Sequence, residues 1–228
     1  MHGWRVRLGA GLLLAVLGLS LIGRSNEVMA RQMPPDRQAR AREVVERPDV
    51  TYTTRIIWDC SARTFERAVE DPVLMGALWQ AYGFAPAYRI SGARDSLHVV
   101  DPTGLLGDAL LYERGAHYVR YVVPGKLNHW AVPVLNTGTA VFDLSWHPSA
   151  ATNGLSAQLD VYVRAGSGIG SVVLRLVRPL LARHVDNRIS LNLLDVQTIM
   201  SAVERDPDRV AQRLEDGWRT RFEAVFGE

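Results

Sequence analysis

A long helical pattern near the C-terminus is the feature that most constrains the fold. Apolar side chains recur every three or four residues from Val172 to Val203, which is the spacing of one face of an α-helix. Pro179 predicts a kink in this helix, and Asp206-Pro207 predicts its end. The Gly-rich stretch 166–170 just before it lacks the spacing of a phosphate-binding loop, so we interpret it as a flexible junction.

Short strand patterns precede this helix. Turn signals recur about every ten to twelve residues, and such spacing predicts antiparallel hairpins. Two late strands alternate clearly: Phe142, Leu144 and Trp146 share one face of the first, and Leu159 and Val161 share one face of the second. One face of the sheet is therefore expected to be apolar and the other polar. The expected strands are Val50–Trp58, Tyr88–Ser91, Leu97–Val100, Asp108–Glu113, His117–Val123, Thr139–His147 and Leu155–Arg164.

Two short helices are expected between the first strand and the hairpins. Ser61 is the expected N-cap of a helix that ends near Glu70. Residues 73–82 predict the second helix. A further amphipathic helix is expected within residues 206–228, with an apolar face formed by Val210, Leu214, Trp218, Phe222 and Phe226.

This order of elements resembles the START-like helix-grip superfamily, also called SRPBCC, which contains lipid-transfer domains, plant hormone-binding proteins and polyketide cyclases. The resemblance covers residues 49–203 and rests on element order, because the superfamily has no strict motif. It implies an α+β fold in which a curved antiparallel sheet wraps around a long C-terminal helix, with a cavity between them. A strongly curved sheet cannot lie flush against a straight helix, so side chains or a ligand must fill the gap.

The N-terminus predicts export or membrane attachment. Arg5 and Arg7 precede the apolar run Leu8–Ile22, as in a secretory signal, and Val28-Met29-Ala30 is a candidate cleavage site. An uncleaved anchor is the alternative, although a helix of this length spans only about 22 Å of a hydrocarbon core about 30 Å thick. Export predicts an extracytoplasmic domain. For an anchor, the arginines that follow the run would keep the domain on the cytoplasmic side.

The chain therefore divides into four parts. Residues 1–30 are the signal peptide or anchor. Residues 31–48 are charged and flanked by proline, which predicts a linker, partly helical. The helix-grip domain is expected over residues 49–205, followed by the C-terminal helix in 206–228.

The apolar sheet face is the first candidate site. It is expected to line a cavity for an apolar small molecule, together with apolar residues of the long helix. The alternative is an ordinary packed core. The expected lining residues are Phe142, Leu144, Trp146, Leu159, Val161, Val196 and Met200.

A second candidate is the segment 124–138, which is much longer than a hairpin needs. It carries several apolar residues, and Trp130 suits an interface that is apolar on one side and wet on the other. It is expected to close over a ligand, enter a membrane interface or contact a partner. The alternative is a loop that folds back over the mouth of the cavity.

A third candidate is a polar set that could supply an acid–base pair inside the cavity. If Arg120 points inward, it could bind a carboxylate or hydroxyl head group, or pair with a buried acid. The alternative is that most of the set faces solvent. The residues are His98, Tyr112, Glu113, His117, Arg120, Tyr121 and Asp143.

Several function classes are excluded or disfavoured. The single cysteine, Cys60, allows no internal disulfide or cysteine-based metal site. The six histidines show no metal-ligand spacing, no catalytic motif is present, and no cofactor is expected. A net charge of +2 gives no indication of nucleic-acid binding. Binding and transport of a lipid, sterol-like, polyketide or aromatic molecule is the first hypothesis; a cyclase or aromatase using cavity Tyr, His or Arg residues is the second, and a membrane-tethered interaction module is the third.

Overall fold

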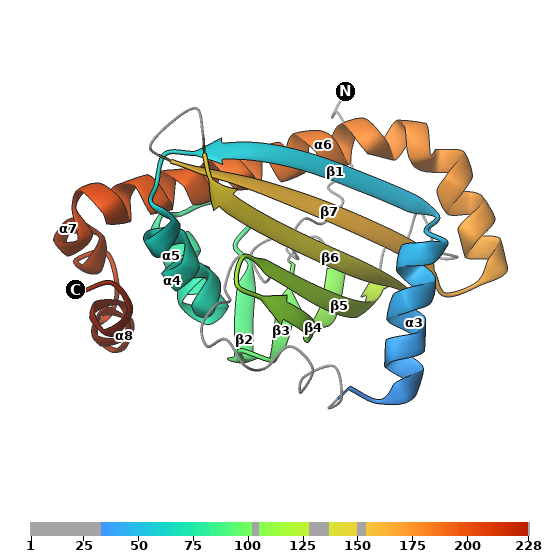
Figure 1. Ribbon diagram of the computed structural model, residues 1–228, viewed down its shortest axis with the longest axis horizontal. Coiled ribbons are helices and arrows are strands. Elements are labelled where there is room, and N and C mark those ends of the chain that lie inside the picture. The colour runs from blue at the N-terminus through green and yellow to red at the C-terminus, as the bar shows by residue number, and fades with distance from the viewer. Residues whose placement is uncertain (1–32, 102–104, 128–136, 150–153, 228) are drawn as a thin grey trace, which may run out of the picture.

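The computed structural model describes residues 33–101, 105–127, 137–149 and 154–227; the side chains of 105–106, 126–127 and 176–186 are excepted. These ranges form a seven-stranded antiparallel sheet in the order β1-β7-β6-β5-β4-β3-β2 (Figure 1). The strands are β1 (Val50–Trp58), β2 (Arg89–Ala93), β3 (Ser96–Val100), β4 (Leu105–Gly115), β5 (Tyr118–Leu127), β6 (Thr137–Pro148) and β7 (Leu155–Ala165).

The register gives the sheet two different faces. Phe142 pairs with Val161 on β7 and with Tyr121 on β5, and residues directly opposite each other in a ladder point to the same side. This side, which we call the inner face, packs against the long helix. The opposite side is the outer face, and it carries Arg120 and Asp143, which are also paired in register.

The long helix is α6 (Gly168–Arg205), which contains 38 residues. It begins where the Ser167 hydroxyl accepts a hydrogen bond from the Gly170 backbone N–H, and it ends before Pro207. Its axis bends in the N-terminal half, which contains Pro179, and it then passes behind β1 (Figure 1). Its inward residues join the core of the domain: Ile189, Leu193, Val196, Ile199, Met200 and Val203.

Four shorter helices extend the same core. They are α4 (Ala62–Glu70), α5 (Pro72–Ala81), α7 (Pro207–Ala211) and α8 (Asp216–Phe226). Ser61 caps α4 as expected, since its hydroxyl accepts from the Thr64 backbone N–H. Asp71 caps α5 and also accepts two hydrogen bonds from Arg221, which ties α8 to α5. The predicted α+β class with a curved antiparallel sheet and helices is confirmed.

The outer face is covered at one end by α3 (Pro35–Glu46) (Figure 1). Ala41 and Val44 of this helix pack with Val122 and Val141 of the sheet. This segment was expected to be a partly helical linker. It forms part of the packed domain instead, because the outer face offers apolar residues that its short apolar stripe can cover.

Residues 1–30, with the expected signal or anchor, lie outside the described residues. Among the residues that the structure describes, no helix is long and apolar enough to cross a membrane. The aromatic residues on the apolar face of the expected C-terminal helix contact the core of the domain. Phe222 and Phe226 are buried in the main core, and Trp218 packs partly against it.

Candidate functional site

The inner face brings together most of the expected ligand-binding residues. They belong to one apolar cluster, and the least buried of them are 6% exposed. This packing matches both the expected lining of a site and the alternative of an ordinary core. The residues are Tyr121, Phe142, Leu144, Trp146, Leu159, Val161, Val196 and Met200.

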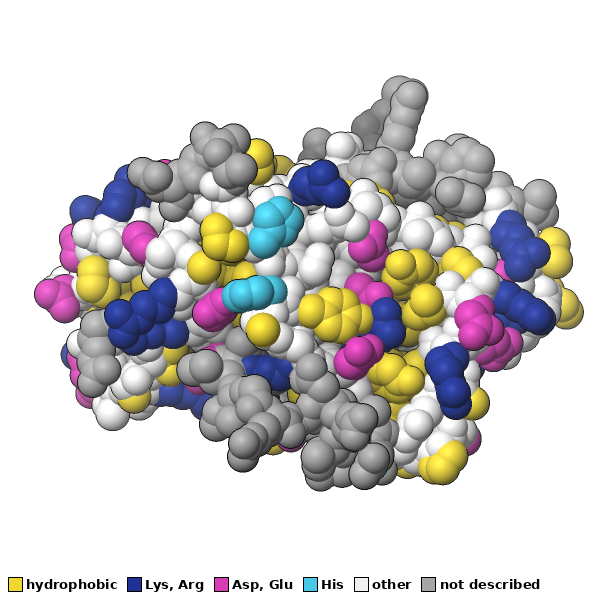
Figure 2. Space-filling view, viewed as in Figure 1, with side chains coloured by type: hydrophobic (Ala, Val, Ile, Leu, Met, Phe, Trp, Pro, Cys, Tyr) yellow, Lys and Arg dark blue, Asp and Glu magenta, His cyan; other side chains and the backbone are white. Residues whose placement is uncertain are grey.

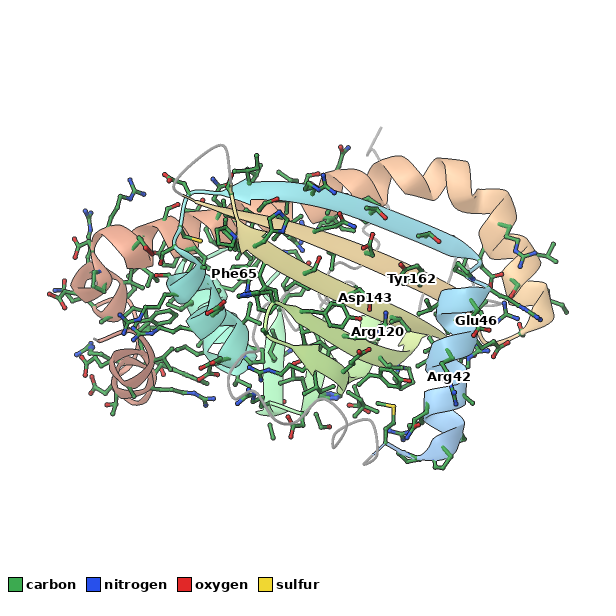
Figure 3. All side chains as sticks on the ribbon, viewed as in Figure 1. Arg42, Glu46, Phe65, Arg120, Asp143 and Tyr162 are labelled. Atoms are coloured by element: carbon green, nitrogen blue, oxygen red, sulfur yellow. The ribbon has the colours of Figure 1, made fainter. Side chains whose placement is uncertain are left out.

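Two expected residues lie elsewhere. Arg120 is on the outer face, where its Nε and Nη2 donate to the two carboxylate oxygens of Asp143 at 2.6 and 2.5 Å (Figure 3). This is the pairing with a buried acid that the sequence left open, and it rules out the cavity role for Arg120. Glu113 adds a third contact, because its Oε2 accepts from Nη1 at 3.3 Å.

The environment of Arg120 favours its charged form. The hydrogen bond with Asp143 raises the pKa of Arg120, against the opposing effect of burial. Burial raises the pKa of the neighbouring Tyr118, and the negative charge of Asp143 raises it further. A bidentate pair of this kind holds β5 and β6 together. Figure 2 shows the outer face, with acidic, basic and apolar side chains next to one another near its centre.

Tyr112 is the other residue that lies elsewhere. It occupies the irregularity between β4 and β5, where the register shifts between Leu111 and Glu113. Leu111 is on the inner face, and Tyr112 packs with the outer cluster beneath α3. Tyr112 follows the inward-facing Leu111 and so points outward by ordinary alternation, and the extra residue shifts the alternation only from Glu113 onward. Trp130 and most of the expected 124–138 loop lie outside the described residues.

A buried polar group on the inner side was missed by sequence reasoning. Tyr88, in the segment before β2, is fully buried. Its hydroxyl oxygen accepts hydrogen bonds from Asn192 Nδ2 at 3.1 Å and from Arg188 Nη2 at 3.2 Å. Both donors belong to α6. Burial is the first cause of a raised pKa for Tyr88, so its hydroxyl stays protonated at neutral pH.

The signal for this group was present in the helix pattern. Asn192 lies three residues after Ile189 and four before Val196, within the apolar stripe of α6. An amide at such a position is fully buried here and needs a polar neighbour. The second donor, Arg188 of the same helix, is half-buried and reaches the Tyr88 hydroxyl.

A second polar group lies where α4 meets the ends of the strands. Glu66 Oε1 accepts from Trp146 Nε1 at 3.2 Å, and His117 Nδ1 lies at the same distance from that oxygen. The Tyr121 hydroxyl donates to the Arg94 carbonyl at 3.3 Å. One turn after Glu66, burial raises the pKa of Glu70 to about 7.

Metal and thiol chemistry have little support within the described ranges. No group of three or more His, Cys, Asp or Glu side chains there could hold a metal ion. Cys60 is buried, and burial raises its pKa to about 12, so its thiol is protonated and a poor nucleophile.

Comparisons with known proteins give the following. No family model matches the chain, and no curated protein does. A solved structure titled Ara h 8.0201 is 12% identical, covers 61% of this chain and 97% of its own, and has a TM-score of 0.35. XoxI from Bacillus cereus is 12% identical, covers 68% of this chain and 99% of its own, and has a TM-score of 0.34. TM-scores this low carry no argument about the fold. The fold rests instead on the strand order of the sheet and on the long helix α6.

Proposed function

We propose that this domain binds an apolar small molecule between the inner face of the sheet and α6. The observation that carries the proposal is the Tyr88 hydroxyl, buried among apolar side chains and held by Asn192 and Arg188. A few polar groups in an apolar interior are what a small-molecule site uses to orient its ligand. The ligand class is a lipid, a sterol-like molecule, a polyketide or an aromatic compound.

Affinity in such a site comes from burial of apolar surface. Each Å² of ligand surface removed from water contributes about 25 cal/mol. The described side chains shield the inner face from solvent, so the ligand enters by displacing part of this packing. We expect bound ligand to stabilise the folded state, because it binds the native state and not the unfolded chain.

We also propose that the N-terminal run 8–22 delivers the domain to a membrane, either as an export signal or as an anchor. The domain would then meet its ligand at the membrane surface. Cell fractionation of the full chain, with the mass of the mature N-terminus, distinguishes a cleaved signal from an anchor. Recovery of the uncleaved chain in the soluble fraction would contradict both.

Native mass spectrometry with lipid extraction tests the ligand directly. The full-length chain is purified from a bacterial host, and we expect a stoichiometric lipid or aromatic species to co-purify. A clean apo mass, with no uptake from a panel of lipids and aromatic compounds, would contradict the proposed function.

Tyr88→Phe sharpens the test. It removes the hydroxyl that the two α6 donors share, with little change in volume. We expect a loss of stability of about 1–2 kcal/mol and a weaker preference for ligands with a polar end. Tyr162→Phe is the matched control, since Tyr162 is a partly buried tyrosine on β7 that packs with the outer cluster, away from the inner face. Equal ligand preference in both variants would contradict the orienting role of Tyr88.

A further inference from the structure

Arg114 is the most unusual side chain of the inner face. It lies near the end of β4 and pairs in register with Val119 of β5. Val119 pairs with Leu144, and Leu144 pairs with Leu159. Arg114 therefore ends a row of buried apolar residues that crosses the inner face of the sheet.

The guanidinium of Arg114 lacks a counter-charge within the described structure. The residue is only 9% exposed, and its Nη2 atom is buried with no hydrogen-bond partner. No described carboxylate forms an ion pair with it. An arginine stays charged under all ordinary conditions, and a buried charge without a partner costs several kcal/mol. A fold tolerates this free-energy cost at a functional site, where a bound ligand supplies the missing partner of the charge.

The surroundings of Arg114 favour a particular charge on that ligand. Arg114 lies one residue before the end of β4, and His117 lies in the turn that follows, where it contacts Glu66 of α4. We call Glu66, His117 and Glu70, which is one helical turn further along α4, the α4 corner. The planar guanidinium of Arg114 carries a single positive charge, so it matches one planar carboxylate by two parallel hydrogen bonds.

The row of apolar residues indicates the length of the apolar part of the ligand. It crosses from β4 to β7, three strand spacings, which amounts to about 14 Å at about 4.8 Å per spacing. An apolar tail of that length, running from Arg114 past Val119 and Leu144, would bury its surface against side chains that are already apolar.

We propose that Arg114 is the binding site for the carboxylate of an amphiphilic monocarboxylic acid, with the tail held between the inner face and α6. This proposal rests on the proposed function and names its ligand class. It assigns Tyr88 and Arg114 to different parts of the site, since Tyr88 contacts α6 and Arg114 lies near the end of β4.

A matched pair of probes separates the carboxylate from the tail. Dodecanoic acid and 1-dodecanol have the same chain length, and their binding to the full-length chain is measured by isothermal titration calorimetry. Arg114→Met keeps a long flexible side chain and removes the charge. We expect it to weaken dodecanoate binding about tenfold or more, as for loss of a charge-assisted bidentate contact, and to change dodecanol binding less than about twofold.

Thermal denaturation of the same variant provides a second readout. We expect Arg114→Met to raise the melting temperature of the ligand-free protein, because it removes an unpaired buried charge. Arg55→Gln is the matched control: Arg55 is exposed on the outer face of β1, and its loss should alter neither probe's affinity nor the melting temperature.

The outcomes are distinguishable. Binding of dodecanol with no advantage for dodecanoate, or an equal loss of both in Arg114→Met, would overturn the carboxylate site and leave the proposed function standing. A lower melting temperature for Arg114→Met would show that Arg114 serves the fold, and would overturn the proposal. Binding of neither probe, nor of any member of the lipid panel, would overturn both.

Discussion

Two arginines, six residues apart on adjacent strands, show how differently the two faces of the sheet are built. Arg120 on the outer face has a complete set of partners, with two hydrogen bonds to Asp143 and one to Glu113. Arg114 on the inner face is the more deeply buried, and its Nη2 has no described partner. A charge that serves the fold is normally paired within the fold. The difference therefore separates a structural arginine from one that is available to a ligand.

Breaking the Arg120 pair should have the largest effect on stability. Asp143→Asn keeps the shape of the side chain but removes the counter-charge that accepts two hydrogen bonds from Arg120, so only the longer contact with Glu113 remains. We expect a loss of about 2–3 kcal/mol, somewhat less than for a fully buried pair, because the Arg120 side chain is still 23% exposed. Urea denaturation measures the loss.

Asp160→Asn is the control for this change. Asp160 lies opposite Asp143 on the outer face of β7 and is half-buried. Its partners are the neutral side chains of Thr53 and Gln158, so its loss should cost less than about 1 kcal/mol. Equal losses of stability in the two variants would show that the Arg120–Asp143 ion pair contributes no more to stability than the hydrogen bonds of Asp160 to neutral side chains.

Replacing the whole pair should have a smaller effect than breaking it. The double variant Arg120→Met with Asp143→Leu removes both charges and fills their space with apolar groups. We expect its free energy of unfolding to lie within about 1 kcal/mol of the wild type, since a buried pair seldom outperforms apolar residues of similar volume. A double variant as unstable as Asp143→Asn would indicate that the pair also sets the register of β5 and β6.

The smallest effect concerns pH and the α4 corner. Burial raises the pKa of Glu70 from 4.5 to about 7. Between these values the folded state holds a proton that the unfolded chain has lost, so stability is fully present below about 4.5 and falls as the pH rises towards 7. Glu70→Gln should flatten this fall, measured as melting temperature against pH.

Glu223→Gln, at an exposed position of α8, should leave the slope unchanged. An unchanged slope in Glu70→Gln would mean that the corner is open to water around this carboxyl.

The sequence was most informative where one face of a strand is wet. Alternation placed Phe142, Leu144 and Trp146 on the inner face, and the structure agrees. The facing of β5 could not be predicted, because Val119 and Tyr121 point inward while Val122 points outward and is equally buried. The reason is α3, which covers part of the outer face and removes the contrast that alternation depends on.

The polar part of the candidate site was less predictable for a different reason. Tyr88 lies outside regular secondary structure, so no periodicity marks its direction. Arg114 follows a register shift that moves it to the inner face. In both cases a local irregularity of the backbone decides the environment, and such irregularities leave only weak traces in the pattern of residue types.

The pairing of β1 with β7 has a consequence for how the chain is made. Val50 lies opposite Val163 and Trp58 opposite Leu155, so the first strand to be synthesised pairs with the last. At translation rates of about 5–20 residues per second, β1 waits on the order of 5–20 seconds for its partner. During that time its hydrogen-bonding edge is open to other chains. A strand with Thr and Arg along its outward side is well suited to that interval, because polar groups on one face make it a poorer template for aggregation.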